Sequence, residues 1–396
     1  MEHFKSVLRR RRYDWGWHTT ALQAALESIR PALAEKISLL GMVGEAEPGF
    51  IAAALMAANQ AGFTLEDFSL NETEKQVHLH WEMGTLPLSA EQHNIQDLES
   101  ALRDAARAHL LGRGEPCGYL PLNTAMLTAS AKRNLFPNAD SPAEGYSQLR
   151  QAIRSALKFQ YGFLRFGGSE KSLDVGLWWL IDDKAAATPL ADRVEIAVVR
   201  YLLRNPGCTL DDIETALKAD FSGAMYPPRA LVAACLGSYG EYDGAGWYIR
   251  AQDHPSRRRA ELVSMGRVIS GLGKKLHFHV HPPKDETQPI IWQDALGNPL
   301  YAFYISASAL LGKFLLRQAP EPVRGILVIP GGRANLTMFK LRRDPRLQKI
   351  ADKNWGFVKY RQIRQMQKNA MLTPATFEDQ LALDPLTYDD EQLRLL

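Results

Sequence analysis

The sequence has few cysteines and no long apolar stretch. Its three cysteines, Cys117, Cys208 and Cys235, are odd in number and far apart, which argues against a disulfide framework or a zinc site built from cysteine pairs. Apolar runs such as residues 175–181 fall well short of the roughly 18 residues that a membrane span needs. Arginines at positions 9–12 and the lack of an apolar core near them do not fit a signal peptide. We therefore expect a cytoplasmic protein that does not enter a membrane.

Charge is divided unevenly along the chain. The 396 residues are 46% hydrophobic and 23% charged, a composition typical of globular proteins, and the net charge is only +3. Residues 312–368, however, carry 14 Lys and Arg against three acidic residues, a net charge of +11, and the tail after them is acidic. The aromatic residues Trp355, Phe357 and Tyr360 lie within the basic segment. This segregation indicates a surface that faces a polyanion, with a solvated basic helix that binds nothing as the alternative.

The first half of the chain predicts an incomplete α/β fold followed by helices. Hydrophobic periodicity favours helices at residues 19–33 and 50–61 and strands at 36–43, 64–70 and 76–81. This order is that of the second half of an α/β sandwich whose first half is missing. Residues 89–184 read as mainly helical, with residues 97–111 and 147–159 as the clearest helices and a Gly-Gly-Ser loop at 167–169.

The second half predicts two further modules. Helices at residues 191–203, 209–221 and 227–236, followed by a strand from residue 246, give the outline of a winged helix, in which Thr209 is the N-cap of the second helix. A helix at 260–272, strands at 276–281, 289–293 and 300–305, a helix at 307–318 and a strand at 324–329 then form a small α/β core. The predicted domains are therefore residues 1–88, 89–186, 187–262 and 263–396.

Several motifs carry a resemblance to a known family. The turn Ala46-Glu-Pro-Gly-Phe50 before an alanine-rich helix, within a stretch that spans residues 13–81, resembles the C-terminal half of large DNA methylase-type proteins found beside restriction and phage-defence genes. The order of Phe221-Ser-Gly, Tyr226-Pro-Pro, Trp247-Tyr-Ile-Arg and Asp253-His-Pro is similar to the winged-helix segment of the same proteins. The chain lacks the Gly-rich donor turn and the Asp/Asn-Pro-Pro-aromatic loop of these enzymes. The resemblance therefore implies a methylase fold whose donor half lies on another polypeptide or was lost.

Residues 290–303 resemble a strand, hairpin and strand of the restriction-endonuclease-like fold. Active members carry an aspartate before the tryptophan and a Glu-x-Glu or Glu-x-Lys pair on the second strand, which hold a divalent metal. This chain has Pro289-Ile-Ile before Trp292, and Tyr304-Ile-Ser306 on the second strand. Asp294 is expected in the hairpin turn. The resemblance thus implies a degenerate nuclease-like core, and we expect no catalytic residue, metal or cofactor.

Three other patterns are weaker candidates for sites. His277, His279 and His281 alternate along an expected strand, but neighbours on one strand face are about 7 Å apart, so three do not readily converge on one metal ion. A solvent- or phosphate-facing sheet surface is preferred, and His78 and His80 are interpreted in the same way. The loop at residues 162–172 does not fit the spacing of a nucleotide-binding loop. The turn from Pro330 to Arg333 is expected to be structural, with phosphate contact as the alternative.

We expect the nucleic-acid contacts to come from cations in the last two modules. These would bind the phosphates of double-stranded DNA, with little base readout and a strong dependence on salt. A protein partner is expected to supply a catalytic domain. Alternatives are a winged helix that binds protein, a scaffold that binds no nucleic acid, and one part of a split DNA methyltransferase with Trp15, Glu45 and Glu47 near the shared site. The expected DNA-binding residues are Arg229, Arg250, Arg257, Arg258, Arg259, Arg333, Lys340, Arg342, Arg343, Arg346, Lys349, Lys353, Lys359, Arg361 and Arg364.

Overall fold

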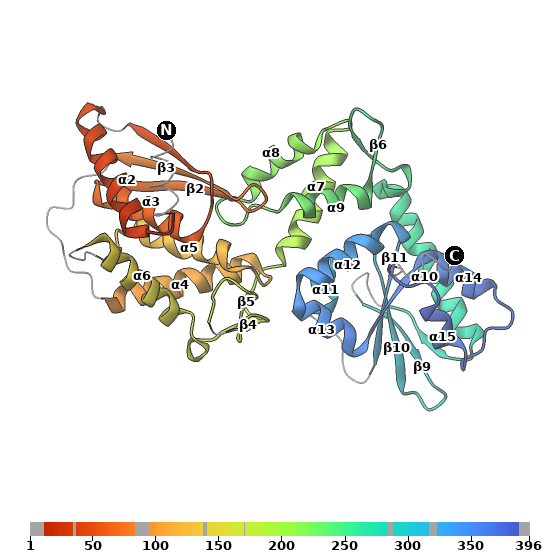
Figure 1. The fold of residues 1–396 in the computed structure, drawn as a ribbon. Helices are drawn as coiled ribbons and strands as arrows, with labels where there is room; N and C mark the ends of the chain where they lie inside the picture. The colour runs from red at the N-terminus through yellow and green to blue at the C-terminus, as the bar shows by residue number, and fades with distance from the viewer. Residues whose placement is uncertain are drawn as a thin grey trace. The chain divides into compact units, whose positions relative to one another are not determined.

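The chain folds into two compact units of mixed α/β structure (Figure 1). The computed structural model describes residues 12–34, 37–83, 95–137, 141–169, 171–283, 288–316 and 323–387. Unit 1 comprises residues 1–187 and 218–228, and unit 2 comprises residues 188–217 and 229–396. In the described ranges, no helix combines the length and the apolar character that crossing a bilayer requires.

Unit 1 is built on a small antiparallel sheet in which the last strand lies in the middle. The strands are β1 (Ser38–Val43), β2 (Phe63–Asn71) and β3 (Gln76–Met83), in the order β1-β3-β2. Because β1 and β2 both run antiparallel to β3, they are parallel to each other, and α3 (Pro48–Gln60) is the crossover between them. The predicted helices and strands of this region are confirmed to within a few residues. Alternation along β3 buries Val77, Leu79 and Trp81, while His78 is exposed on the other face.

Helices cover the buried face of this sheet. Leu55 of α3, Phe63 of β2 and Leu122 of a following helix belong to one hydrophobic core. Local signals explain where two helices begin, because Asp14 and Ser141 each accept a hydrogen bond from a backbone N–H in the first turn that follows. The helices of unit 1 besides α3 are α2 (Trp15–Ile29), α4 (Ile95–Arg113), α5 (Tyr119–Lys132) and α6 (Pro142–Ala156).

A hairpin that the sequence did not predict follows α6. Strands β4 (Phe163–Phe166) and β5 (Leu177–Leu180) pair antiparallel, and the Gly-Gly-Ser loop lies in their connection. Gly168 has φ +82°, and a β-carbon there would collide with the carbonyl oxygen of Val175. A strand that leads into a second strand does not have the strand-to-helix geometry of a phosphate-binding loop.

The three helices expected between residues 191 and 236 are present, and the strand expected from residue 246 pairs with a preceding strand; most of this segment belongs to unit 2. These are α7 (Leu190–Arg204), α8 (Leu210–Asp220), α9 (Arg229–Tyr239), β6 (Gly240–Tyr242) and β7 (Trp247–Ile249). Thr209 is confirmed as the N-cap of α8: its Oγ1 accepts a hydrogen bond from the backbone N–H of Asp212 (3.2 Å), and Asp212 accepts one from the N–H of Thr209 (2.9 Å).

A five-stranded mixed sheet forms the centre of unit 2, in the order β12-β11-β10-β9-β8. β8, β9 and β10 are an antiparallel meander, and β10, β11 and β12 are parallel. One hydrophobic cluster lies between the sheet and α10, α14 and α15, and another between the sheet and α11 to α13. The elements are α10 (Pro255–Lys275), β8 (His279–His281), β9 (Ile290–Gln293), β10 (Pro299–Ile305), α11 (Leu311–Leu315), β11 (Arg324–Ile329), α12 (Ala334–Arg343), α13 (Pro345–Asn354), β12 (Trp355–Lys359), α14 (Tyr360–Lys368) and α15 (Phe377–Ala382).

The structure differs from the predicted elements of this core in four places, the first being that α12, α13, α14 and α15 were not predicted. β12 was not predicted, because its five residues lie inside the basic segment. Of the helix expected at residues 307–318, residues 311–315 form α11, and residues 317–318 lie outside the described residues. Residues 306–308 form a turn in which the Ser306 hydroxyl accepts a hydrogen bond from the N–H of Ser308 (3.2 Å). His277 has φ +63° and lies before β8 rather than in it. Asp294 is confirmed in the β9–β10 turn, where it accepts hydrogen bonds from the N–H groups of Leu296 and Asn298.

Candidate nucleic-acid interface

Folding divides the fifteen expected DNA-binding cations into three groups by exposure. Four are buried, three are half-buried and eight are exposed. The buried group is Arg258, Arg333, Lys340 and Lys359; the half-buried group is Arg250, Arg343 and Arg346; the exposed group is Arg229, Arg257, Arg259, Arg342, Lys349, Lys353, Arg361 and Arg364.

Lys340 lies inside unit 2 and cannot contact DNA in this structure. Its side chain is 1% exposed, and its Nζ is 2.7 Å from Asp192 Oδ1, bonds the carboxylate of Glu195 and donates to the carbonyl of Ala309 (3.0 Å). Burial alone would lower the pKa of Lys340, but these two carboxylates raise it above its usual value. The expectation that Lys340 binds phosphate is therefore wrong for this fold. Its ion pairs join α12 to α7 instead.

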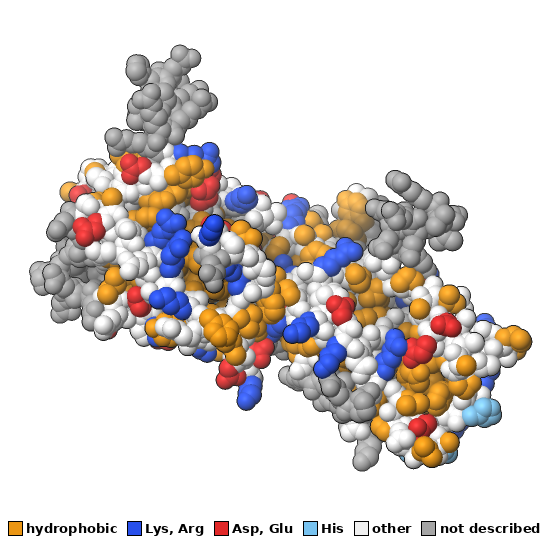
Figure 2. Space-filling view, turned by 60° about the horizontal axis from the view of Figure 1, so that its bottom comes forward, with side chains coloured by type: hydrophobic (Ala, Val, Ile, Leu, Met, Phe, Trp, Pro, Cys, Tyr) orange, Lys and Arg blue, Asp and Glu red, His pale blue; other side chains and the backbone are white. Residues whose placement is uncertain are grey.

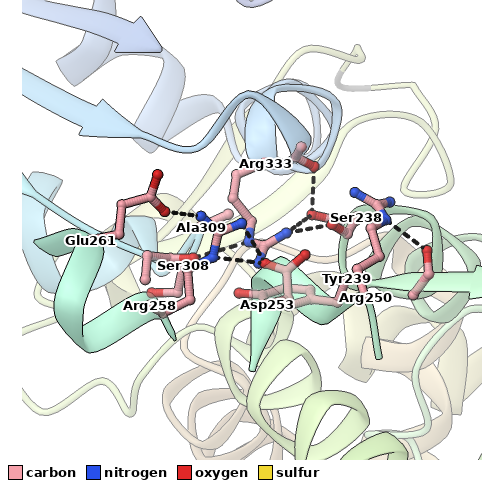
Figure 3. A network of polar contacts seen from close by, with 12 residues as sticks. Ser238, Tyr239, Arg250, Asp253, Arg258, Glu261, Ser308, Ala309 and Arg333 are labelled. Atoms are coloured by element: carbon pink, nitrogen blue, oxygen red, sulfur yellow. Dashed lines mark hydrogen bonds and ion pairs between the residues drawn. The ribbon is translucent and has the colours of Figure 1, made fainter. Parts of the chain in front are cut away.

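Arg333 is the centre of a second buried network (Figure 3). It pairs with Asp253, donates to the backbone carbonyls of Ser238 and Ala307, and its guanidinium lies 3.3 Å from the centre of the Tyr239 ring. The side chain has no exposed surface, so the turn from Pro330 to Arg333 has the structural role that the sequence favoured, and the expected DNA contact of Arg333 is wrong.

The same network holds Arg258 in place. Its guanidinium donates to Asp253 Oδ1 at 2.7 Å and pairs with Glu261 (Figure 3). Arg258 is only 9% exposed. Its expected role as a phosphate contact is therefore also wrong in this structure.

The acidic tail neutralises another part of the basic segment. Asp384 is 2.8 Å from Lys359 Nζ and also accepts hydrogen bonds from Arg361 (2.6 and 2.7 Å). These hydrogen bonds, chiefly those from Arg361, lower the pKa of Asp384 to about 2. Lys359 is buried by this pairing, which corrects its prediction as a DNA contact, and Arg361 on the surface is held by the same carboxylate.

Two further exposed arginines are held by acids. Arg364 pairs with Glu261 (2.8 Å). Arg229, the cation that α9 was expected to present to DNA, pairs with Glu214 (2.9 Å) and Asp211 (3.2 Å). A helix whose cation is already tied to two carboxylates offers little for base readout.

Further cations lie at the end of α12 and along α13. Arg342 and Lys349 are exposed and Arg343 is half-buried, while Lys353 is exposed one turn after Lys349. Leu347 and Ala351, on the other side of α13, are buried in the core. We call Arg342, Arg343, Lys349 and Lys353 the α12–α13 surface. Arg346 is nearby, but its side chain is 9% exposed and pairs with Asp344 (2.6 Å).

The remaining expected candidates are dispersed. Arg257 and Arg259 are exposed near the start of α10, and Arg250 donates to the carbonyl of Gly240 (2.9 Å). On the face drawn in Figure 2, Lys and Arg side chains lie in small groups separated by neutral and hydrophobic ones.

The histidines of β8 do not form a cluster. His279 and His281 are exposed, and His281 Nε2 lies 2.7 Å from Gln293 Oε1. In the part of the chain that the structure describes, no three His, Cys, Asp or Glu side chains lie close enough together to hold a metal ion.

A cavity of about 500 Å³ in unit 1 was not predicted from the sequence. Trp15 and Glu47, which the split-enzyme alternative placed near one site, both line it, but Glu45 pairs with Arg12 (2.8 Å). The cavity also takes residues from α5, α6 and the β4–β5 loop, so its lining runs from Trp15 to Asp174 along the chain. The feature of the sequence that could have indicated this site is the pair Arg150 and Arg154, two cations one helical turn apart on α6.

Comparisons of the chain with protein-family models, with curated proteins and with solved structures found no match. The resemblance to DNA methylase-type proteins therefore stays a prediction. The side-chain geometry described above is what supports the functions proposed below.

Proposed function

We propose that this protein is a DNA-binding accessory subunit of a DNA-modification or phage-defence system, and that it has no catalytic centre of its own. The observation that carries the proposal is the α12–α13 surface. Most other expected cations are buried or paired with acids, whereas Arg342 and Lys349 stay exposed on consecutive helices. Such side chains bind phosphates without reading bases, so affinity comes from counterion release and falls with salt.

The side chains at the expected nuclease positions support the accessory role. Tyr304 is buried against Phe314 and Trp355, and the Ser306 hydroxyl donates to the backbone carbonyl of Ser308 (2.9 Å). Hard divalent cations prefer charged oxygen ligands, which neither side chain provides. Asp294 is occupied by the backbone of its own turn. The core would thus contribute shape and surface to binding, and a partner would contribute the chemistry.

The test is a triple charge reversal, Arg342→Glu, Lys349→Glu and Lys353→Glu. Fluorescence anisotropy with a short labelled duplex should show at least about a 10-fold decrease of affinity in low salt, and the slope of log K against log salt should shrink by about 0.9 for each phosphate that the variant no longer binds. The matched control is Arg133→Glu, Lys158→Glu and Lys184→Glu, three exposed cations of unit 1. Unchanged duplex binding, or an equal decrease in the control, would contradict the proposal.

A split DNA methyltransferase is the second candidate, and one feature of unit 1 favours it. Among the described residues β1 pairs with β3 alone, so its other edge is open. Leu40 and Met42 on this strand are 78% and 63% exposed, which is unusual for large apolar side chains of an edge strand. A partner chain that adds a strand here would cover them. Mixing the protein with the polypeptide encoded upstream and assaying transfer of a labelled methyl group to DNA tests this candidate.

A further inference from the structure

Apolar, aromatic and cationic side chains line the cavity of unit 1, a combination that suits an anion with a planar ring. It lies among the start of α2, the start of α3, α5, α6 and the β4–β5 loop. Apolar side chains such as Leu127 and Ile153 form part of the wall, and three aromatic side chains, Trp15, Tyr119 and Tyr146, form another part. Its volume of about 500 Å³ falls within the range of small-molecule sites.

Cationic side chains gather at the rim of this cavity. Arg150 and Arg154 lie one turn apart on α6, and Lys171 lies in the β4–β5 loop; in the described part of the chain no ion pair joins any of the three to a carboxylate. Like charges at this helical spacing repel each other, so an anion bound between them would be stabilised. Lys75 adds a fourth cation to the lining.

The lining holds two acids, Glu47 and Asp174, against four cations. Glu47 is opposed by Arg12, whose Nη2 is 4.0 Å from the Glu47 carboxylate. Asp174 is exposed at the rim, 3.4 Å from the Ser172 hydroxyl. The start of α3 also lines the cavity, and Glu47, its N-cap, makes no side-chain capping bond to the described residues, so the positive end of the helix dipole faces this region.

A buried amide points to a ligand independently of the charges. Asn123 lines the cavity and is 1% exposed, and its Nδ2 has no hydrogen-bond partner among the described residues. A buried polar group without a partner loses its hydrogen bonds to water and gains none in return, so such groups are rare in native structures unless a ligand or water meets them. A ligand with a hydrogen-bond acceptor on a flat edge would satisfy this donor.

The aromatic wall is held firmly in place. The ring of Trp15 packs on the first turn of α3 so closely that a β-carbon at Gly49 would collide with it, and it meets Phe50 edge-on at 4.9 Å and Tyr146 at 6.1 Å. Pre-ordered aromatic rings provide stacking surfaces for planar ligands at small entropic cost.

We propose that this cavity binds a phosphorylated nucleotide. The phosphate binds Arg150, Arg154 and Lys171, the base lies against Trp15 and Tyr146, and an acceptor on the base edge meets Asn123. A free nucleotide and the 5′-phosphorylated end of a DNA strand share this chemistry. The site goes beyond the proposed DNA binding and uses none of the residues of the α12–α13 surface, so either function can fail without the other.

Isothermal titration calorimetry on the full chain tests the proposal. The probes are AMP, GMP, CMP, adenosine and inorganic phosphate, together with an eight-nucleotide DNA strand with and without a 5′-phosphate. We expect at least one nucleotide to bind with a Kd below about 1 mM and adenosine to bind at least about 10-fold more weakly than AMP. Preference for the phosphorylated strand over every free nucleotide assigns the site to a strand end, and the reverse assigns it to free nucleotides.

Variants separate the two halves of the site. Arg150→Gln with Arg154→Gln should weaken the binding of the nucleotide and of inorganic phosphate by about 10-fold or more, because the two guanidinium groups hold the phosphate of both. Tyr146→Leu should weaken the nucleotide and leave inorganic phosphate unchanged. The matched control, Arg133→Gln with Lys158→Gln, removes two exposed cations that do not line the cavity and should change neither. Equal melting temperatures of the arginine variant and its control show that the fold is kept.

The proposal is overturned if none of the nucleotides or strands binds, if adenosine binds as well as AMP, or if the arginine variant behaves like its control.

Discussion

The interior of unit 2 and the cavity of unit 1 both gather cationic side chains, and they differ in what neutralises them. Lys340 and Arg333 are almost fully buried, and each is paired with at least one buried carboxylate. Arg150 and Arg154 are exposed at the mouth of the cavity, and no ion pair joins them to an acid of the described chain. The first arrangement is complete within the chain, whereas the second would be completed by the nucleotide phosphate that we propose binds there.

Pairing with a buried carboxylate therefore distinguishes cations that stabilise the fold from cations that are candidates for binding a ligand. A buried ion is stable only where its partners replace water, so each cation inside unit 2 identifies an internal junction. Lys340 joins α12 to Asp192 and Glu195 of α7, and Glu195 also accepts hydrogen bonds from Tyr239 of α9 and from the N–H of Ala309 (2.8 Å). These bonds hold the three-helix region and the five-stranded core together as one unit.

The largest expected effect comes from breaking this junction. Lys340→Met leaves Asp192 and Glu195 buried without a counter-ion, and removing one partner of a buried pair costs about 3–5 kcal/mol. Hydrogen exchange measured by mass spectrometry should show faster exchange in α7, α9 and α12 and unchanged exchange in unit 1.

Lys349→Met is the matched control, because Lys349 is an exposed lysine of the neighbouring helix. We expect it to change the free energy of unfolding by less than about 0.5 kcal/mol. If the two variants were equally stable, the contrast between buried, paired cations and exposed ones would have no energetic basis.

Much of the fold was predictable because its determinants are local. Alternating apolar residues marked β3, the pair Thr209 and Asp212 marked the start of α8, and Asp294 with Gly297 marked the β9–β10 turn. Each of these signals acts within a few residues. β12 was missed because its apolar residues are few and lie between basic helices. Its strand conformation depends on parallel pairing with β11, which is distant in sequence.

The candidate sites were harder to predict because they depend on distant pairs. Lys340 and Asp192 are 148 positions apart, so a sum of charges along the chain counted Lys340 as available. The charge pattern missed the cations of the cavity, since neither Arg150 nor Lys171 lies in a basic segment. Only the fold shows that α6 and the β4–β5 loop meet at one rim.

The response to acid gives a smaller and separate way to sharpen the comparison of the two units. In unit 1, burial and then the charge of Arg113 lower the pKa of His109 to about 3, from 6.5. Its folded form is therefore neutral, while the unfolded chain takes up a proton below pH 6.5, so stability is lost as the pH falls from 6.5 toward 3. In unit 2, the lowered pKa of Asp384 contributes stability that is lost only below about pH 4.

Between pH 6.5 and 4, these two groups therefore destabilise unit 1 and not unit 2. At pH 5, protonation of His109 in the unfolded chain alone costs unit 1 about 2 kcal/mol relative to neutral pH. Urea unfolding followed by hydrogen exchange at pH 7 and pH 5 measures each unit separately. In His109→Leu the pH difference in unit 1 should disappear, and because each variant is compared with itself, any packing defect of the leucine cancels. Acid sensitivity at pH 5 that persists in this variant would have to come from another group.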